Sequence, residues 1–80
     1  MNKNTIVVMF DKQEGESFLQ RFISLVYKRQ YSINFLSFDL DSGIIHVTLQ
    51  QLGTLPLENF ILQVKNMYNC SEVLHIPIDQ

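Results

Sequence analysis

Apolar residues change their spacing along the chain, and the changes predict alternating strands and helices. Residues 5–10 form a continuous run of β-branched, apolar and aromatic side chains that ends at the polar segment 11–16, as a buried strand does when it enters a loop. From Phe18 the apolar positions recur every three or four residues, which is typical of one face of an amphipathic helix. These patterns predict a strand over 5–10 and then a helix that ends near Arg29.

Two sequence patterns compete for the start of this helix. Ser17 with Gln20 fits a capping box, in which a hydroxyl and an amide satisfy unpaired backbone donors. Asp11 with Glu14 fits the same pattern and would extend the helix backward through Gly15, at a cost of about 1 kcal/mol relative to alanine. We therefore expect the later start, directly after Ser17.

The middle of the chain has the pattern of a β-hairpin. Two strand-like runs, 33–40 and 44–49, are separated by the short polar loop 41–43. Gly43 at the end of this loop suits a left-handed backbone conformation. In the second run apolar residues alternate with polar ones such as His46, so one face of this strand is expected to meet the core.

A second helix and a last strand complete the pattern. Thr54 and Pro56 mark a helix start, and the apolar positions that follow have helical spacing up to about 68–69. Residues 73–76 then form a short strand-like run, which Pro77 stops. The order strand, helix, strand, strand, helix, strand predicts a ferredoxin-like α+β fold, with one antiparallel four-stranded sheet and both helices on one face.

Composition limits what such a chain can do. With 80 residues, 46% of them hydrophobic and 18% charged, we expect one domain over 1–80 with one core. A core this small is thinly stable, and Cys70, the only cysteine, allows no internal disulfide, so we expect a partner chain to add stability. The net charge of −2 and the absence of a signal or membrane-spanning stretch favour a cytoplasmic protein that binds neither nucleic acid nor membrane.

No group of residues has the pattern of an active site. A metal carrier of this fold needs paired thiolates in the first loop, and an RNA-recognition domain needs aromatic residues on the strand 44–49. An acylphosphatase-like site would need an arginine beside the loop 11–16, which is acidic instead. His46 and His75 fall on strands that are not neighbours in this fold. We therefore expect no enzyme activity, no catalytic residue, no metal site and no cofactor.

Three segments resemble the ACT domain of acetolactate synthase small subunits, and the resemblance covers nearly the whole chain. They are the first strand, residues 28–33 at the end of the first helix, and residues 67–76 at the end of the chain. The family commonly has Arg-Gly-Tyr-Asn-Ile where this chain has Arg29-Gln30-Tyr31-Ser32-Ile33. Its first loop is also shorter and less acidic than residues 11–17 of this sequence.

This resemblance implies a non-catalytic regulatory subunit of branched-chain amino acid biosynthesis. Such a subunit forms a homodimer side by side, with one continuous sheet, and docks on a larger thiamine-diphosphate catalytic chain. An amino acid effector binds between the first loop of one chain and the second strand of its neighbour, which assigns Asp11, Gly15, Ser32 and Ile33 to the site. The same residues also fit ordinary turn and strand positions, and the same fold also fits a stand-alone ACT-like sensor or interaction domain with a different partner.

Overall fold

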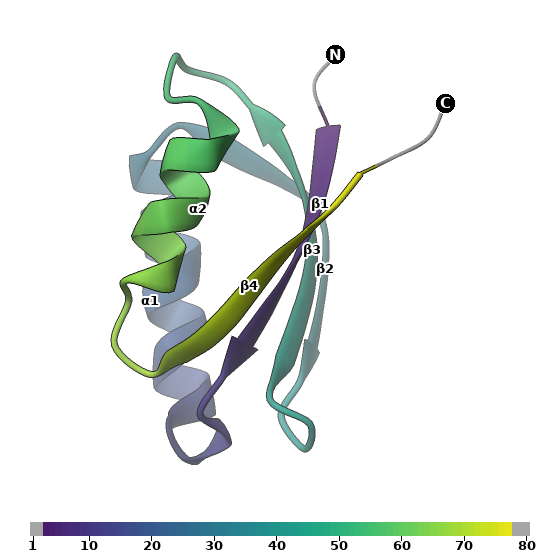
Figure 1. Cartoon of the computed structure of the whole chain (residues 1–80), viewed down its shortest axis with the longest axis vertical. Coiled ribbons are helices and arrows are strands. Elements are labelled where there is room, and N and C mark those ends of the chain that lie inside the picture. The colour runs from purple at the N-terminus through teal and green to yellow at the C-terminus, as the bar shows by residue number, and fades with distance from the viewer. Residues whose placement is uncertain (1–2, 78–80) are drawn as a thin grey trace.

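Strands and helices alternate in the order that the hydrophobic pattern predicts (Figure 1). The computed structural model describes residues 3–77. The strands are β1 (Lys3–Phe10), β2 (Tyr31–Asp39), β3 (Ile44–Gln51) and β4 (Cys70–Ile76). The helices are α1 (Gly15–Lys28) and α2 (Leu57–Lys65), and a 3-10 turn, η1 (Lys12–Glu14), precedes α1. Neither helix of this part of the chain is long and apolar enough to cross a membrane.

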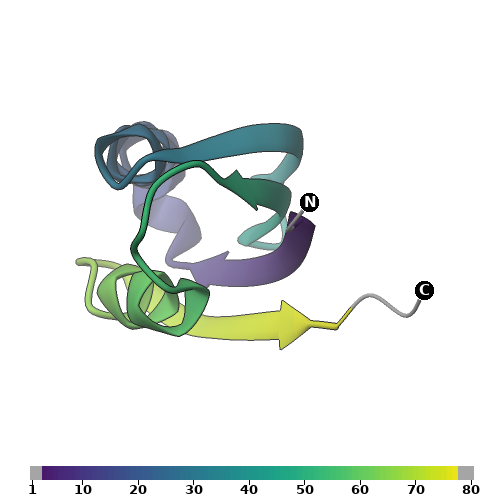
Figure 2. The same ribbon diagram turned by 90° about the horizontal axis from the view of Figure 1, so that it is seen from above.

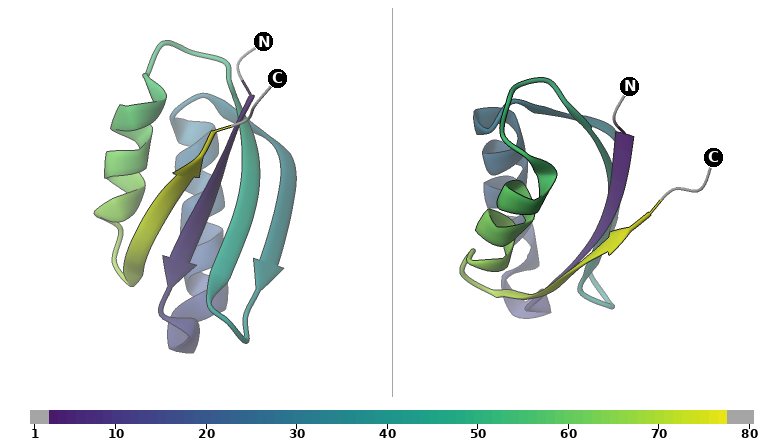
Figure 3. Two further views of the ribbon diagram at one scale, coloured as in Figure 1. Left: turned by 45° about the vertical axis from the view of Figure 1, so that its right-hand side comes forward. Right: turned by 45° about the horizontal axis from the view of Figure 1, so that its top comes forward.

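The four strands form one antiparallel sheet in the order β2-β3-β1-β4. Both helices lie on the same face of this sheet, as the two orientations of Figure 3 and the view from above in Figure 2 show. The βαββαβ order and this strand order define the ferredoxin-like α+β fold, which confirms the predicted fold class. The strands β2 and β4 are the two edges of the sheet.

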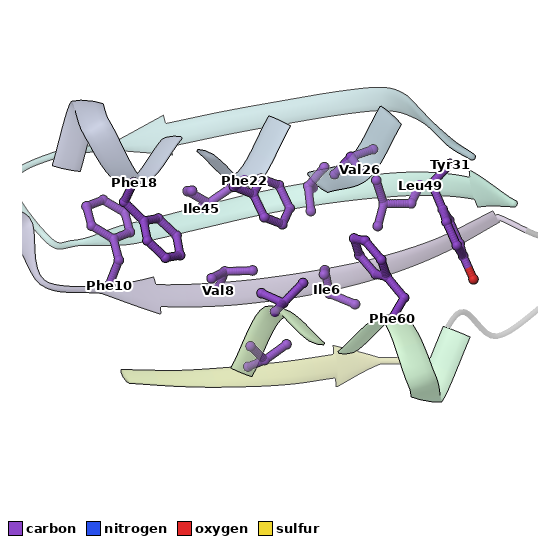
Figure 4. Packing of buried hydrophobic residues seen from close by; sticks show 13 residues of the cluster. Ile6, Val8, Phe10, Phe18, Phe22, Val26, Tyr31, Ile45, Leu49 and Phe60 are labelled. Carbon is purple, nitrogen blue, oxygen red and sulfur yellow. The ribbon is translucent and has the colours of Figure 1, made fainter. Parts of the chain in front are cut away.

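The hydrophobic core lies between the sheet and the two helices (Figure 4). Alternate residues of the strands point toward the helices, because successive side chains of a strand face opposite sides. The strands supply Ile6, Val8, Phe10, Tyr31, Ile45, Val47, Leu49 and Val73 to the buried cluster, and the helices supply Phe18, Phe22, Val26, Phe60 and Val64. Among the described residues no polar or charged side chain is buried.

Aromatic stacks close the two ends of this core. At the end where α1 begins, the ring of Phe10 stacks on those of Phe18 and Phe38, with centroids 5.4 and 5.5 Å apart. At the other end the ring of Tyr31 stacks on that of Phe60, with centroids 4.8 Å apart, and the Tyr31 hydroxyl donates a hydrogen bond of 2.6 Å to the carbonyl of Leu55. Tyr31 therefore joins the start of β2 to α2 through its ring, and to the loop before α2 through its hydroxyl.

The predicted start of the first helix is wrong. The helix begins at Gly15, two residues before the expected cap Ser17, and its N-cap residue Glu14 makes no side-chain capping hydrogen bond. Asp11 caps the 3-10 turn instead, because its carboxylate accepts a hydrogen bond of 3.1 Å from the backbone N–H of Gln13. A glycine is tolerated within the helix because the space beside Gly15 is already filled by other side chains.

Several other boundaries also differ from the prediction. The second helix ends at Lys65, short of 68–69, and the chain then turns through Asn69, which has a left-handed φ of 73°. Asparagine tolerates this conformation better than most residues, so the turn lets β4 begin at Cys70 rather than at residue 73. The hairpin loop and Gly43, with a φ of 71°, confirm the predicted turn.

Candidate functional site

The four residues assigned to the effector site lie at opposite ends of the chain's fold. Asp11 and Gly15 lie where β1 leads into α1, whereas Ser32 and Ile33 lie at the start of β2, beyond the other end of α1. A helix of 14 residues is about 21 Å long. One chain alone therefore does not bring the two pairs together.

Asp11 holds the backbone of the first loop. Its carboxylate accepts the Gln13 amide, and its carbonyl accepts a hydrogen bond of 3.1 Å from the amide of Glu14. Its own amide donates to the carbonyl of Asn69 at 2.9 Å, which ties the loop to the segment before β4. The side chain of Asp11 is exposed, so this loop is both ordered by its own hydrogen bonds and open to solvent on one side.

Gly15 is a point of close packing. A Cβ atom at this position would lie 2.3 Å from Cδ1 of Leu40 and 3.0 Å from Cε2 of Phe10. It would also lie 3.6 Å from Cζ of Phe38. The glycine therefore lets the end of the β2–β3 hairpin lie directly on the first turn of α1. Because glycine has no side chain, a ligand at this position could contact only its backbone.

A hollow of about 310 Å³ adjoins this packing contact. It is lined by η1, the first turn of α1 and the hairpin, through Lys12, Gln13, Glu14, Gly15, Glu16, Ser17 and Leu40. The lining carries one cation and two carboxylates, and the Lys12 ammonium donates a hydrogen bond of 3.4 Å to the carbonyl of Asp41. Both signs of charge needed to meet the ammonium and the carboxylate of a free amino acid are therefore present.

Ser32 and Ile33 follow a left-handed residue. Gln30 has a φ of 62°, and its carbonyl accepts hydrogen bonds from the amides of Leu52 and Gly53, at 2.9 and 3.1 Å. These bonds fix the start of β2 against the end of β3. Ile33 is half-buried and packs against the core, while Ser32 pairs in register with Gln50 and lies half-buried on the strand.

Gln30→Gly is expected to raise the stability of the protein. The left-handed region costs an L-residue about 1–2 kcal/mol, which exceeds the added chain entropy of glycine, so we expect a gain of about 0.5–1 kcal/mol. The midpoint of thermal unfolding should then rise by roughly 3–6 °C. Asn69→Gly, at a φ of 73°, is the matched control and should change the midpoint less, since asparagine adopts this conformation more readily. A lowered midpoint for Gln30→Gly would show that the packing of its side chain on Gly53 outweighs the strain.

The remaining reactive side chains lie apart from the hollow. His46 is exposed on β3, and His75 on β4 shares a hydrogen bond of 3.2 Å between its Nε2 and the amide oxygen of Asn4. The strand β1 separates the two histidines, as predicted. Burial raises the pKa of the half-buried Cys70 thiol, so this cysteine is a weak nucleophile at neutral pH. Within residues 3–77 no three His, Cys, Asp or Glu side chains are grouped to hold a metal ion.

Sequence reasoning named Gly15, which lines the hollow, and Asp11, which adjoins it, but did not name the other lining residues Lys12, Gln13, Glu14, Glu16, Ser17 and Leu40. Lys12 and Ser17 are in the same loop and could have been included, whereas the approach of Leu40 has no signal in the sequence. Comparison with known proteins adds no relative: no protein-family model matches the chain, and no curated protein matches its sequence. The fold and the site geometry therefore define a ferredoxin-like α+β domain with a small charged hollow beside its first helix.

Proposed function

We propose that this chain is a cytoplasmic, non-catalytic regulatory subunit of the ACT type, which dimerises and modulates an acetolactate synthase catalytic chain in branched-chain amino acid biosynthesis. The resemblance of residues 28–33 and 67–76 to the small subunits of that enzyme supports the partner. The ferredoxin-like fold is compatible with an ACT domain, and the charged hollow supports an amino acid effector. The observation that carries the proposal is the geometry of the edge strand β2.

The strand β2 is suited to pairing with a second copy of itself. It has nine residues, and none of them is proline, lysine or arginine, the residues that commonly protect an edge strand. The other edge strand, β4, has seven residues and is followed directly by Pro77. The bulge at Asn34 interrupts this edge, and on either side of it the free N–H and C=O groups would gain partners from an added strand. We therefore assign the dimer contact to β2.

Such pairing would assemble the divided effector site. In an antiparallel pair of β2 strands centred near Phe35, the start of β2 in the second copy lies beside the end of β2 in the first, with Ile33 on the helix side of the sheet. Phe38 and Leu40 are the residues that approach Gly15 beside the hollow. The start of β2 in one chain would then lie about one strand spacing, roughly 4.8 Å, from the hairpin end that borders the hollow of the other. Residues at opposite ends of one chain thus become neighbours across a two-fold axis.

The hollow offers complementary groups for both ends of a free amino acid. Lys12 and the amides in the first turn of α1 suit the effector's carboxylate, since a helix N-terminus carries partial positive charge. Glu14 and Glu16 suit its ammonium group. Apolar side chains at the rim, such as Leu40, suit a branched aliphatic side chain. Valine, leucine and isoleucine are therefore the effectors to test.

The effector is tested by thermal unfolding with and without each of these three amino acids. A ligand that binds only the native state, at ten times its Kd, adds about 1.4 kcal/mol. For a domain of this size the midpoint should rise by roughly 5–10 °C. Lys12→Ala should abolish the rise, whereas Lys28→Ala, at an exposed lysine at the other end of α1, should keep it. A midpoint that none of the three amino acids moves would contradict the effector site.

A further inference from the structure

The sheet has one face that no element of residues 3–77 covers, opposite the two helices (Figure 1). We call this surface the open face. Its side chains follow from the strand register, because outward-pointing residues align in rows across the sheet. The rows are Phe35-Thr48-Thr5-Ile76, Ser37-His46-Val7-Leu74 and Asp39-Ile44-Met9-Glu72.

Half of the side chains in these rows are apolar, namely Phe35, Ile76, Val7, Leu74, Ile44 and Met9. Phe35, Leu74 and Ile76 on the edge strands are 59%, 43% and 41% exposed. Val7, in the middle row, is only 6% exposed although it points away from the core, so the side chains around it form a continuous layer. The hydroxyls of Thr5 and Thr48 share a hydrogen bond of 3.0 Å. Covering the face would therefore bury apolar area while the two threonine hydroxyls keep each other as hydrogen-bond partners.

Charges lie at the two ends of the open face rather than within it. Asp39 and Glu72 flank the row at one end. Lys3 lies at the other end, one row beyond Thr5, and points to the same side because it is two residues away on the strand. The face is thus acidic at one end and basic at the other, and the two rows between them mix apolar side chains with Thr5, Thr48, Ser37 and His46.

We propose that the open face of this chain packs against the open face of a second copy, with the strands of the two sheets antiparallel. In this orientation Lys3 of each copy lies over Asp39 and Glu72 of the other. With parallel strands the acidic ends would face each other, which charge repulsion disfavours. Two sheets packed in this way lie about 10 Å apart at roughly −30°, as in a β-sandwich. The two-fold axis then passes between the two middle rows, so Leu74 of each copy lies against Ile76 of the other.

The size of the open face indicates which assembly forms. Four strands about 4.8 Å apart and about six residues long present roughly 400 Å² per chain, so two single chains bury about 800 Å² in projection. Specific interfaces generally exceed about 1,000 Å², so single chains would pair weakly. Two chains already joined at β2 present a face of twice the width. The inference of a tetramer rests on the β2 pairing in the proposed function. The tetramer would consist of two side-by-side pairs that contact each other through their open faces.

The mass of the purified protein in solution tests this proposal. We expect the wild type to be tetrameric by light scattering or sedimentation over a range of concentrations. Leu74→Glu places a carboxylate against the apolar Ile76 of the other copy and should reduce the mass to that of a dimer. Leu62→Glu, at an equally exposed leucine on α2, is the control and should remain tetrameric. Ile76→Glu is a second variant for the face, and a thermal melt of each variant verifies that it is folded.

A variant of the β2 edge separates this inference from the proposed function. Asn34 is exposed at the bulge in β2, beside the centre of the expected strand pair. Asn34→Lys would bring two like charges together at the edge and should leave chains that pair only weakly through their open faces, with a mass between monomer and dimer that rises with concentration. A wild-type dimer that Leu74→Glu splits and Asn34→Lys does not would support the open-face contact and overturn the edge pairing. A wild-type mass that Leu74→Glu and Ile76→Glu leave unchanged would overturn the open-face contact, whatever Asn34→Lys does.

Discussion

Phe60→Ala is expected to lower the free energy of unfolding by about 3–5 kcal/mol. Phe60 is fully buried, and its ring stacks on that of Tyr31 with a centroid distance of 4.8 Å. It is also the main contact of α2, a helix of nine residues, with the core. A chain of this length has a total stability of about 4–12 kcal/mol, so this one substitution should remove much of it.

Chemical denaturation of Phe60→Ala beside Leu62→Ala measures this effect. Leu62 lies on the same helix, but 57% of it is exposed, so its truncation should cost less than about 1 kcal/mol. Both variants place alanine near the middle of α2, and the gain in helix propensity is below about 0.7 kcal/mol in each, so it does not account for the loss expected of Phe60→Ala. Equal losses for the two variants would show that α2 does not anchor the core through Phe60.

Gly43→Ala should be the second most damaging of these substitutions, with a loss of about 2–3 kcal/mol. Gly43 has a φ of 71°, and an added Cβ would lie 2.7 Å from the carbonyl oxygen of Phe10. The contacting atom is backbone, so it cannot move aside as a flexible side chain would. The amide of Phe10 also donates a hydrogen bond of 2.9 Å to the carbonyl of Gly43, which fixes the distance between the two segments.

Two companion variants distinguish the causes of this loss. Gly43→Asn relieves part of the conformational strain, because asparagine tolerates a left-handed φ, but it keeps the contact with Phe10. It should therefore recover only part of the stability. Ser42→Ala, in the same exposed turn, should have an effect within about 0.5 kcal/mol of zero. A fully stable Gly43→Asn protein would mean that φ alone matters and that the close contact relaxes freely.

The order and type of every main element could be predicted from hydrophobic spacing. Spacing reports which face of an element is buried, and burial dominates the choice between helix and strand in this chain. The start of α1 could not be predicted, because both capping patterns are chemically sound and the choice depends on a tertiary contact. Gly15 lies under Leu40, 25 positions further along the chain, and no local pattern reports that approach.

The candidate site could be predicted from the sequence only in part. All four candidate residues come from the resemblance; Gly15 lines the hollow, and Asp11 adjoins it in the same loop. Ser32 and Ile33 come from the resemblance and lie at the far end of the chain's fold, so they can join this site only from another copy. Their role stays a prediction until the pairing of β2 is measured.

The most direct test of the account is the rate of acetolactate formation by the large acetolactate synthase chain of the same organism, measured with and without this protein. We predict that the two chains elute together, and that this protein changes the rate to a limit reached at a fixed stoichiometry. Valine, leucine or isoleucine should alter that limit, and Lys12→Ala should remove the amino acid response. If the two chains elute separately and the rate is unchanged, the regulatory-subunit account is contradicted, and a stand-alone ACT-like domain with a different partner is the reading that replaces it.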